Sequence, residues 1–344
     1  MGHGAEHLEM TAGERETIMA RVARLFRDNP MVPLIVFLVL LVAALEIMRP
    51  GIVTPFRAGR DGFISTFWVG NLIKFAIPLA MLAACQVLTM LTAGIDLSVG
   101  IVATVAAFVC ATVSSIWGVA PAILLALASG VVVGLVNGIG VGLVRVHPLI
   151  MTLGTGLIAT GCLQVYQRFV INAGSQVPEF LTWLGTGRTL GMPNGLFLFV
   201  PFAIFVIWLM RSTGFGRLLF ALGSNENAAK LSGVRLWQVH IALYVLSGLI
   251  AAVAGLLYLG MIRQTSLSLA NPLLLPSVAA AVIGGTSIFG GRGSYSGAIV
   301  GALILRVLDT MLTLLQMPEG ARTALFGVII LAFTALYVRI TGTR

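Results

Sequence analysis

The stretch MVPLIVFLVLLVAALEIM, residues 31–48, has one charged side chain, Glu46. An apolar run of this length matches the thickness of a lipid bilayer when it is helical. Similar runs recur along the 344 residues, of which 58% are hydrophobic and 10% are charged, against about 25% charged in a soluble domain. The runs are continuous rather than alternating, which favours helices over the strands of a membrane barrel. The sequence therefore predicts an all-α polytopic membrane protein.

About ten transmembrane helices are predicted, at roughly 20 residues for each crossing. The expected spans are 31–48, 68–93, 99–117, 119–144, 148–166, 195–210, 239–260, 272–289, 295–316 and 322–339. Residues 31–344 then form a single transmembrane domain in which 211–238 is a cytoplasmic loop. Residues 1–30 are expected to be a cytoplasmic segment with a helix lying in the membrane interface. Ten spans divide into two fives, and an odd number in each half implies halves that are inverted in the membrane.

The net charge of +9 has an explanation in membrane topology. Most of the arginines stand singly at span ends, which indicates topology anchors rather than a surface for nucleic acid. With a cytoplasmic N-terminus, twelve Lys and Arg residues fall on the inside and seven on the outside. This bias agrees with the positive-inside rule and predicts that orientation.

Catalytic and cofactor chemistry is not indicated by the sequence. Cys85, Cys110 and Cys162 lie in apolar runs without the spacing of metal ligands, so no metal site is expected. Neither lysine follows a glycine, which excludes the Gly-Lys-Ser/Thr phosphate loop and with it this way of binding ATP. We expect no catalytic residue and no cofactor.

A short polar stretch, GSNENAAKLSG at residues 223–233, interrupts the apolar sequence. Ser224 or Asn225 can cap a helix, Glu226 suits its first turn, and Gly233 supplies a stop. The result is about two turns, which is too short to be stable alone in water. The segment is therefore expected to dock on a partner, although an unpartnered surface helix remains the alternative.

The same stretch resembles the coupling loop of ABC importer permeases. Residues 227–233 fit its Glu-Ala-Ala-x-x-x-Gly pattern with Asn227 in place of Glu, and residues 213–234 are similar to the ribose/xylose-type sugar permease family. The resemblance implies a coupling helix that sits in a groove of an ATPase subunit. Its residues are Ser224, Asn225, Glu226, Asn227, Ala228, Ala229, Lys230, Leu231, Ser232 and Gly233.

Three further blocks of sequence resemble this family, and they occur along the chain in the same order as in its members. They are GIDLSVG at 94–100, RVHPLIMTLGT at 145–155 and GGTSIFGGRGS at 284–294. Ala93 and Asp309-Thr310 depart from the family, which often has Gly at the first position and Asn-Gly at the second. Asp96 is open to two interpretations, a capped cytoplasmic turn or a broken helix beside the substrate path. Arg306 and Asp309, at i and i+3, are expected to pair, with either a structural or a gating role.

Two further sets of residues are candidates for function. Hydroxyl and amide side chains suit a polar solute, and the candidate substrate path comprises Gln86, Asp96, Ser98, Thr152, Thr155 and Gln164. Outward-facing arginines are candidates for docking an external protein with acidic patches, and they are Arg57, Arg60, Arg168 and Arg188.

The resemblance implies the permease of an ATP-driven importer for a monosaccharide or related polyol. Its expected partners are a second permease copy, an ABC-type ATPase subunit, a periplasmic or lipid-anchored sugar-binding protein, and membrane lipid. The implied fold is similar to that of vitamin B12 importer permeases, in a bacterial plasma (inner) membrane. The alternative is an ion-coupled secondary transporter, which would need acidic side chains within the membrane, and only Glu46, Asp96 and Asp309 are available.

Overall fold

The structure is a computed structural model, and it describes residues 31–49, 67–170, 174–325, 327–328 and 331. Its elements are α2 (Met31–Met48), α3 (Phe67–Met90), α4 (Val99–Trp117), α5 (Val119–Gly142), α6 (Pro148–Val170), α7 (Glu179–Thr186), β1 (Arg188–Thr189), β2 (Met192–Pro193), α8 (Gly195–Ser212), α9 (Gly214–Ser224), α10 (Glu226–Leu231), α11 (Leu236–Ile262), η1 (Asn271–Leu273), α12 (Leu274–Ile283) and α13 (Tyr295–Leu314). The chain is helical again at 319–325. The predicted N-terminal segment 1–30 lies outside the described residues.

Eight helices of the described part are long and apolar enough to cross a membrane, which confirms the all-α membrane fold. They correspond to eight of the ten predicted spans. The span predicted at 272–289 is too long, because its helix ends at Ile283 where the glycine-rich block 284–294 begins. The span predicted at 322–339 lies largely outside the described residues. The inverted halves and the likeness to vitamin B12 importer permeases remain predictions.

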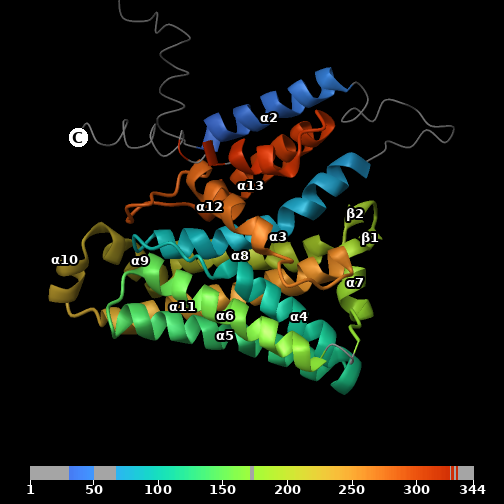
Figure 1. Ribbon diagram of the computed structural model, residues 1–344. Helices are drawn as coiled ribbons and strands as arrows, with labels where there is room; N and C mark the ends of the chain where they lie inside the picture. The colour runs from blue at the N-terminus through green and yellow to red at the C-terminus, as the bar shows by residue number, and fades with distance from the viewer. Residues whose placement is uncertain (1–30, 50–66, 171–173, 326, 329–330, 332–344) are drawn as a thin grey trace, which may run out of the picture.

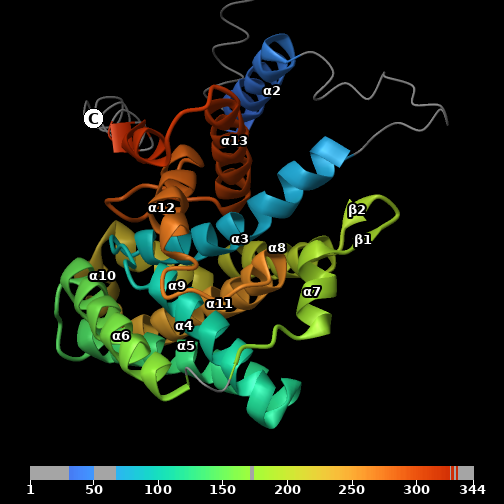
Figure 2. The same cartoon turned by 45° about the vertical axis from the view of Figure 1, so that its right-hand side comes forward.

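The helices form two groups that α3 connects (Figure 1). One group contains α4, α5, α6, α7, α8 and α11, and the other contains α2, α12 and α13. Both views show α2 lying along α13, apart from α4, α5 and α6 (Figures 1 and 2). Because α3 packs on helices of both groups, much of its length is buried, including Met81, Ala83 and Leu88.

The most extensive helix contact joins α5 to α11. Gly130, Gly134 and Gly138 are spaced four apart on α5 and face the backbone of α11 around Tyr244 and Gly248. A Cβ atom at Gly134 would collide with the Tyr244 carbonyl, and one at Gly248 would collide with the Gly130 carbonyl. Small residues at this spacing let membrane helices approach until their backbones touch.

The two ends of the molecule carry different elements. The end with α9 and α10, here called the α10 end, lies opposite the two-stranded ribbon of β1 and β2 (Figure 1). The ribbon pairs Arg188 with Pro193 and Thr189 with Met192, and it lies near the start of α3, where Gly70 is close to Gly191. We call this second end the ribbon end.

Replacing Gly134 with alanine tests the α5–α11 contact. Gly134→Ala is expected to lower the free energy of unfolding by about 1–3 kcal/mol, because the added methyl group meets backbone that cannot rotate away. Gly161→Ala on α6 is the matched control, since a Cβ there has no neighbour within 4 Å. Thermal unfolding of the purified variants in detergent measures the difference, and equal midpoints would contradict the contact.

Candidate functional site

The first candidate site is the capped segment between α8 and α11. The Asn225 side chain accepts a hydrogen bond from the Ala228 amide over 3.0 Å and so caps α10. Glu226 occupies the first turn, and Gly233, with φ of 84°, follows the end of the helix. The predicted short helix is therefore present, with six residues rather than the whole of 224–233. Ser224 is not its cap, because this residue ends α9 and its hydroxyl donates to the Phe220 carbonyl.

Most of this segment is exposed. Ala229 is buried against the rest of the protein, whereas Leu231 keeps 90% of its surface exposed. A cavity of about 200 Å³ lies between α10 and the nearby ends of α5 and α11, and Glu226, Lys230 and Trp237 are among the residues that line it. The helix thus stands off the bundle at one end of the molecule, where Figure 1 also places it.

Behind α10, three distant parts of the chain meet. The Gly291 amide donates to the Leu91 carbonyl over 3.0 Å. A Cβ atom at Gly223 would collide with that same carbonyl, so the end of α9 lies directly against the end of α3. The end of α9, next to α10, is therefore in backbone contact with the point where α3 stops.

The second candidate site is the break between α3 and α4, where Asp96 is 2% exposed. One oxygen of its carboxylate accepts hydrogen bonds from the Ser98 amide (3.0 Å) and hydroxyl (2.6 Å). The other oxygen accepts from the Ser247 hydroxyl over 2.8 Å. The Gln86 side-chain amide donates to the backbone carbonyl of Asp96 over 2.8 Å and accepts from the backbone amide of Asp96. Burial raises the pKa of the Asp96 carboxyl, and the hydrogen bonds from Ser98 and Ser247 oppose that shift.

The hydrogen bonds continue into α5 and α6. Asn137 donates to the Ser98 hydroxyl over 2.9 Å and accepts from the Thr155 hydroxyl over 2.5 Å. The Thr152 hydroxyl accepts from the Leu97 amide over 3.0 Å, which satisfies a backbone group that the break leaves free. The side chains from α3, the break, α5, α6 and α11 thus form one buried network. Its members are Gln86, Asp96, Ser98, Asn137, Thr152, Thr155 and Ser247.

Five of the six residues predicted for the substrate path lie in this network, where they bond to one another. Gln164 does not, because it is exposed on α6. The network also contains Asn137 and Ser247, which the sequence analysis did not single out. A signal was available, since polar side chains within apolar spans are rarely without a partner. Both interpretations of Asp96 remain predictions, because its bond from the Ser98 amide at the start of α4 suits a capped turn and its burial suits a broken helix.

The arginines predicted to dock an external protein are described only in part. Arg57 and Arg60 lie outside the described residues. Arg168 is exposed in the last turn of α6, and Arg188 stands in β1, where it donates to the Asn71 side chain over 2.8 Å. The predicted pair of Arg306 and Asp309 is present, with a distance of 2.6 Å between the charged groups.

Comparison with known proteins identifies the class of this molecule. A family model described as branched-chain amino acid transport system / permease component matches residues 68–334. The chain belongs to this permease family. The probable ABC transporter permease protein YphD of Escherichia coli is 37% identical over 83% of the chain and 86% of its own length. No solved structure gives a significant match.

Two further relatives are named as sugar import permeases. The ribose import permease protein RbsC of Bacillus subtilis is 33% identical, over 92% of this chain and 96% of its own. The fructose import permease protein FrcC of Rhizobium meliloti is 30% identical, over 93% and 89%. The resemblance to ribose/xylose-type ABC permeases is thereby confirmed, and this permease is a transport subunit rather than an enzyme.

Removing the Asp96 side chain tests the network. Asp96→Ala leaves the Ser98 and Ser247 donors without an acceptor in a buried site, so the free energy of unfolding is expected to fall by about 3 kcal/mol. Asp96→Asn keeps the shape and part of the bonding and is expected to cost about 1 kcal/mol. Thermal unfolding in detergent gives the comparison, with Gln164→Ala as the exposed control. Wild-type stability of Asp96→Ala would show that the bonds do not hold the break.

Proposed function

We propose that the chain is the membrane-spanning permease of an ATP-driven importer for a monosaccharide or related polyol. The curated relatives named for ribose and fructose support the substrate class. A separate ATPase subunit hydrolyses ATP, and an external binding protein delivers the solute. Two permease copies form the pathway in a bacterial inner membrane, with the N-terminus in the cytoplasm.

The observation that carries the proposal is the exposed, capped helix α10. Six helical residues are too few to be stable alone, yet Asn225 and Gly233 fix both ends of this helix. An apolar side chain left 90% exposed at its tip, Leu231, suits a groove in another protein. Because the helix stands at one end of the bundle, an ATPase can bind it without entering the membrane.

The contact behind α10 supports a route for the coupling. A force on α9 and α10 reaches the end of α3 through the backbone contact of Gly223 with Leu91. Asp96 lies five residues beyond Leu91, and its network holds the break against α5, α6 and α11. In the proposed mechanism ATP binding moves α10, and the break between α3 and α4 serves as the joint at which the spans change their openings.

Reconstituted transport tests the function. Proteoliposomes that contain the permease, its ATPase and its binding protein are expected to accumulate radiolabelled sugar only with internal ATP, on the side of the ATPase. Accumulation by the permease alone, driven by a proton or sodium gradient, would instead establish the ion-coupled transporter. D-Ribose, D-xylose, D-fructose and myo-inositol form the test panel, with L-leucine as a solute of a different class.

A leucine exchange tests the role of α10. Leu231→Asp is expected to reduce co-purification of the ATPase about tenfold or more, because a charge replaces an apolar contact in the groove, while thermal stability stays unchanged. Leu190→Asp is the matched control, since Leu190 is 99% exposed in the ribbon turn at the opposite end. Full retention of the ATPase by Leu231→Asp would refute the proposed contact.

A further inference from the structure

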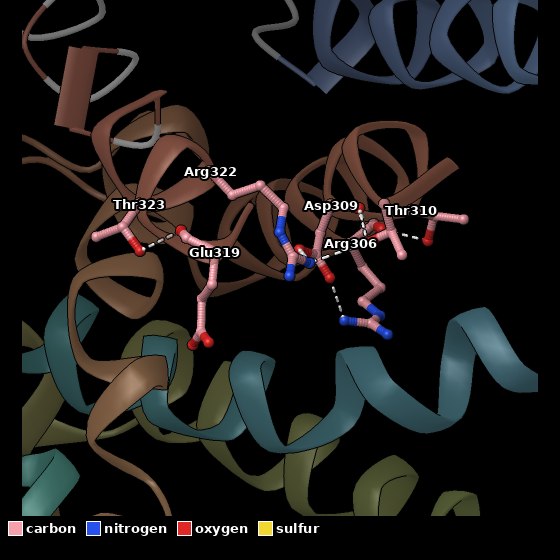
Figure 3. Close-up of polar contacts among 7 residues, drawn as sticks. Arg306, Asp309, Thr310, Glu319, Arg322 and Thr323 are labelled. Atoms are coloured by element: carbon pink, nitrogen blue, oxygen red, sulfur yellow. Dashed lines mark hydrogen bonds and ion pairs between the residues drawn. The ribbon is translucent and has the colours of Figure 1, made fainter. Parts of the chain in front are cut away.

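A cavity of about 340 Å³ opens between the two helix groups. Its walls come from α3, α11, η1, α12, α13 and the helical residues 319–323. Two aromatic rings, Phe75 and Tyr258, line it together with Asn271. On the side of α13 and 319–323 the wall is polar, formed by Arg306, Asp309, Glu319, Arg322 and Thr323 (Figure 3).

The centre of the polar wall is Asp309, which two arginines share. Its carboxylate lies 2.6 Å from the Arg306 guanidinium and 3.1 Å from that of Arg322. Arg322 also donates to the Thr313 hydroxyl over 2.9 Å, and the Arg306 guanidinium lies over the Phe75 ring at 4.6 Å from its centroid. These contacts fix the orientation of the two guanidinium groups before any solute arrives.

The wall keeps unused capacity for hydrogen bonds. Within the described residues, the Glu319 carboxylate has no ion pair and no hydrogen bond, although its side chain is exposed to the cavity. The Arg322 Nε atom is buried and has no partner there either. The Glu319 carboxylate thus remains available as an acceptor beside two aromatic rings, and a few polar groups among apolar and aromatic side chains are the usual composition of a small-molecule site.

The cavity lies far from α10. The end of α3 at Leu91 touches Gly223, whereas Leu79 and Phe75 lie 12 and 16 residues earlier on α3, or about 18 and 24 Å at 1.5 Å per residue. Arg306 and Asp309 likewise stand well along α13 from its start at Tyr295, near Gly291. If α10 faces the cytoplasm, the cavity therefore belongs to the outer half of the permease.

The charges of the lining narrow the class of ligand. Arg306 and Arg322 are balanced by Asp309 and Glu319, so the wall has no net charge. A charged solute would gain little from such a balanced wall, whereas a neutral solute with many hydroxyl groups can use its donors and acceptors together. The volume lies at the lower end of the range for small-molecule sites, which suits one sugar ring.

We propose that this cavity is a binding site for a single neutral sugar or cyclic polyol on its way from the outer side. The ring stacks on Tyr258, while its hydroxyl groups meet Glu319, Arg322 and Asn271. The proposal rests on the proposed function, and it adds the place and the residues at which the permease itself holds the solute.

Protection of a cysteine from modification tests the site. Thr323→Cys, in a Cys162→Ser background that removes the exposed cysteine of the described residues, is labelled in membrane vesicles by an impermeant thiol reagent from the ribbon-end side. Saturating D-ribose, D-xylose, D-fructose or myo-inositol is expected to slow this labelling several-fold, and L-leucine is not. Leu190→Cys, at the same end but outside the cavity, is the control, and its labelling rate should be the same with and without each solute.

A second variant tests whether the cavity lining causes the protection by sugar. Glu319→Ala added to Thr323→Cys is expected to raise the protecting sugar concentration about tenfold, as the loss of a charged hydrogen-bond partner predicts. Glu179→Ala, an exposed acid in α7, should leave it unchanged. If the reconstituted complex imports sugar but no member of the panel protects Thr323→Cys, the cavity proposal fails and the function stands. Protection by L-leucine alone would overturn the ligand class.

Discussion

The contact between the backbones of α5 and α11 sets the geometry on which the interior depends. Gly130, Gly134 and Gly248 remove the side chains that would hold these helices apart. Two polar residues of the buried network are next to glycines of this contact in the sequence, since Asn137 precedes Gly138 and Ser247 precedes Gly248. Close packing therefore brings Asn137 and Ser247 within reach of the break after α3. A wider separation of the helices would leave the Asp96 carboxylate buried without its bonds, which is among the costliest arrangements a protein interior can contain.

The break itself combines two properties that a moving part needs. Its backbone is irregular, so it can change shape without unwinding a helix, and its polar groups are satisfied by side chains from four helices. Networks of this kind are rigid while complete and unstable when partly broken. The structure thus places this network near the backbone contact of Gly223 with Leu91, on the side where α10 is exposed.

The sequence predicted the membrane fold, eight of the spans and the short capped helix, because these depend on local composition and on residue types such as Asn225 and Gly233. The span that contains α12 was predicted too long, because it was extended across Gly284-Gly285-Thr286-Ser287 to the apolar Ile288-Phe289, whereas the Gly284-Gly285 step ends the helix. The sequence grouped five residues of the network as candidates for one substrate path, but it did not predict that they bond to one another. These residues are Gln86, Asp96, Ser98, Thr152 and Thr155. Their bonding partners on α5 and α11 depend on tertiary packing, as does the meeting of Phe75 with Arg306. The docking role of Arg168 and Arg188 remains a prediction.

The exposure of Leu231 also has a consequence for how such a complex is assembled in the cell. Under the proposed contact, a chain without its ATPase leaves this leucine in water, and only the paired chain gains the free energy of binding. Permease made in excess of its ATPase would then be less stable than the paired chains and more open to proteolysis. The same side chain that receives the motor would thereby keep the numbers of the two subunits in balance.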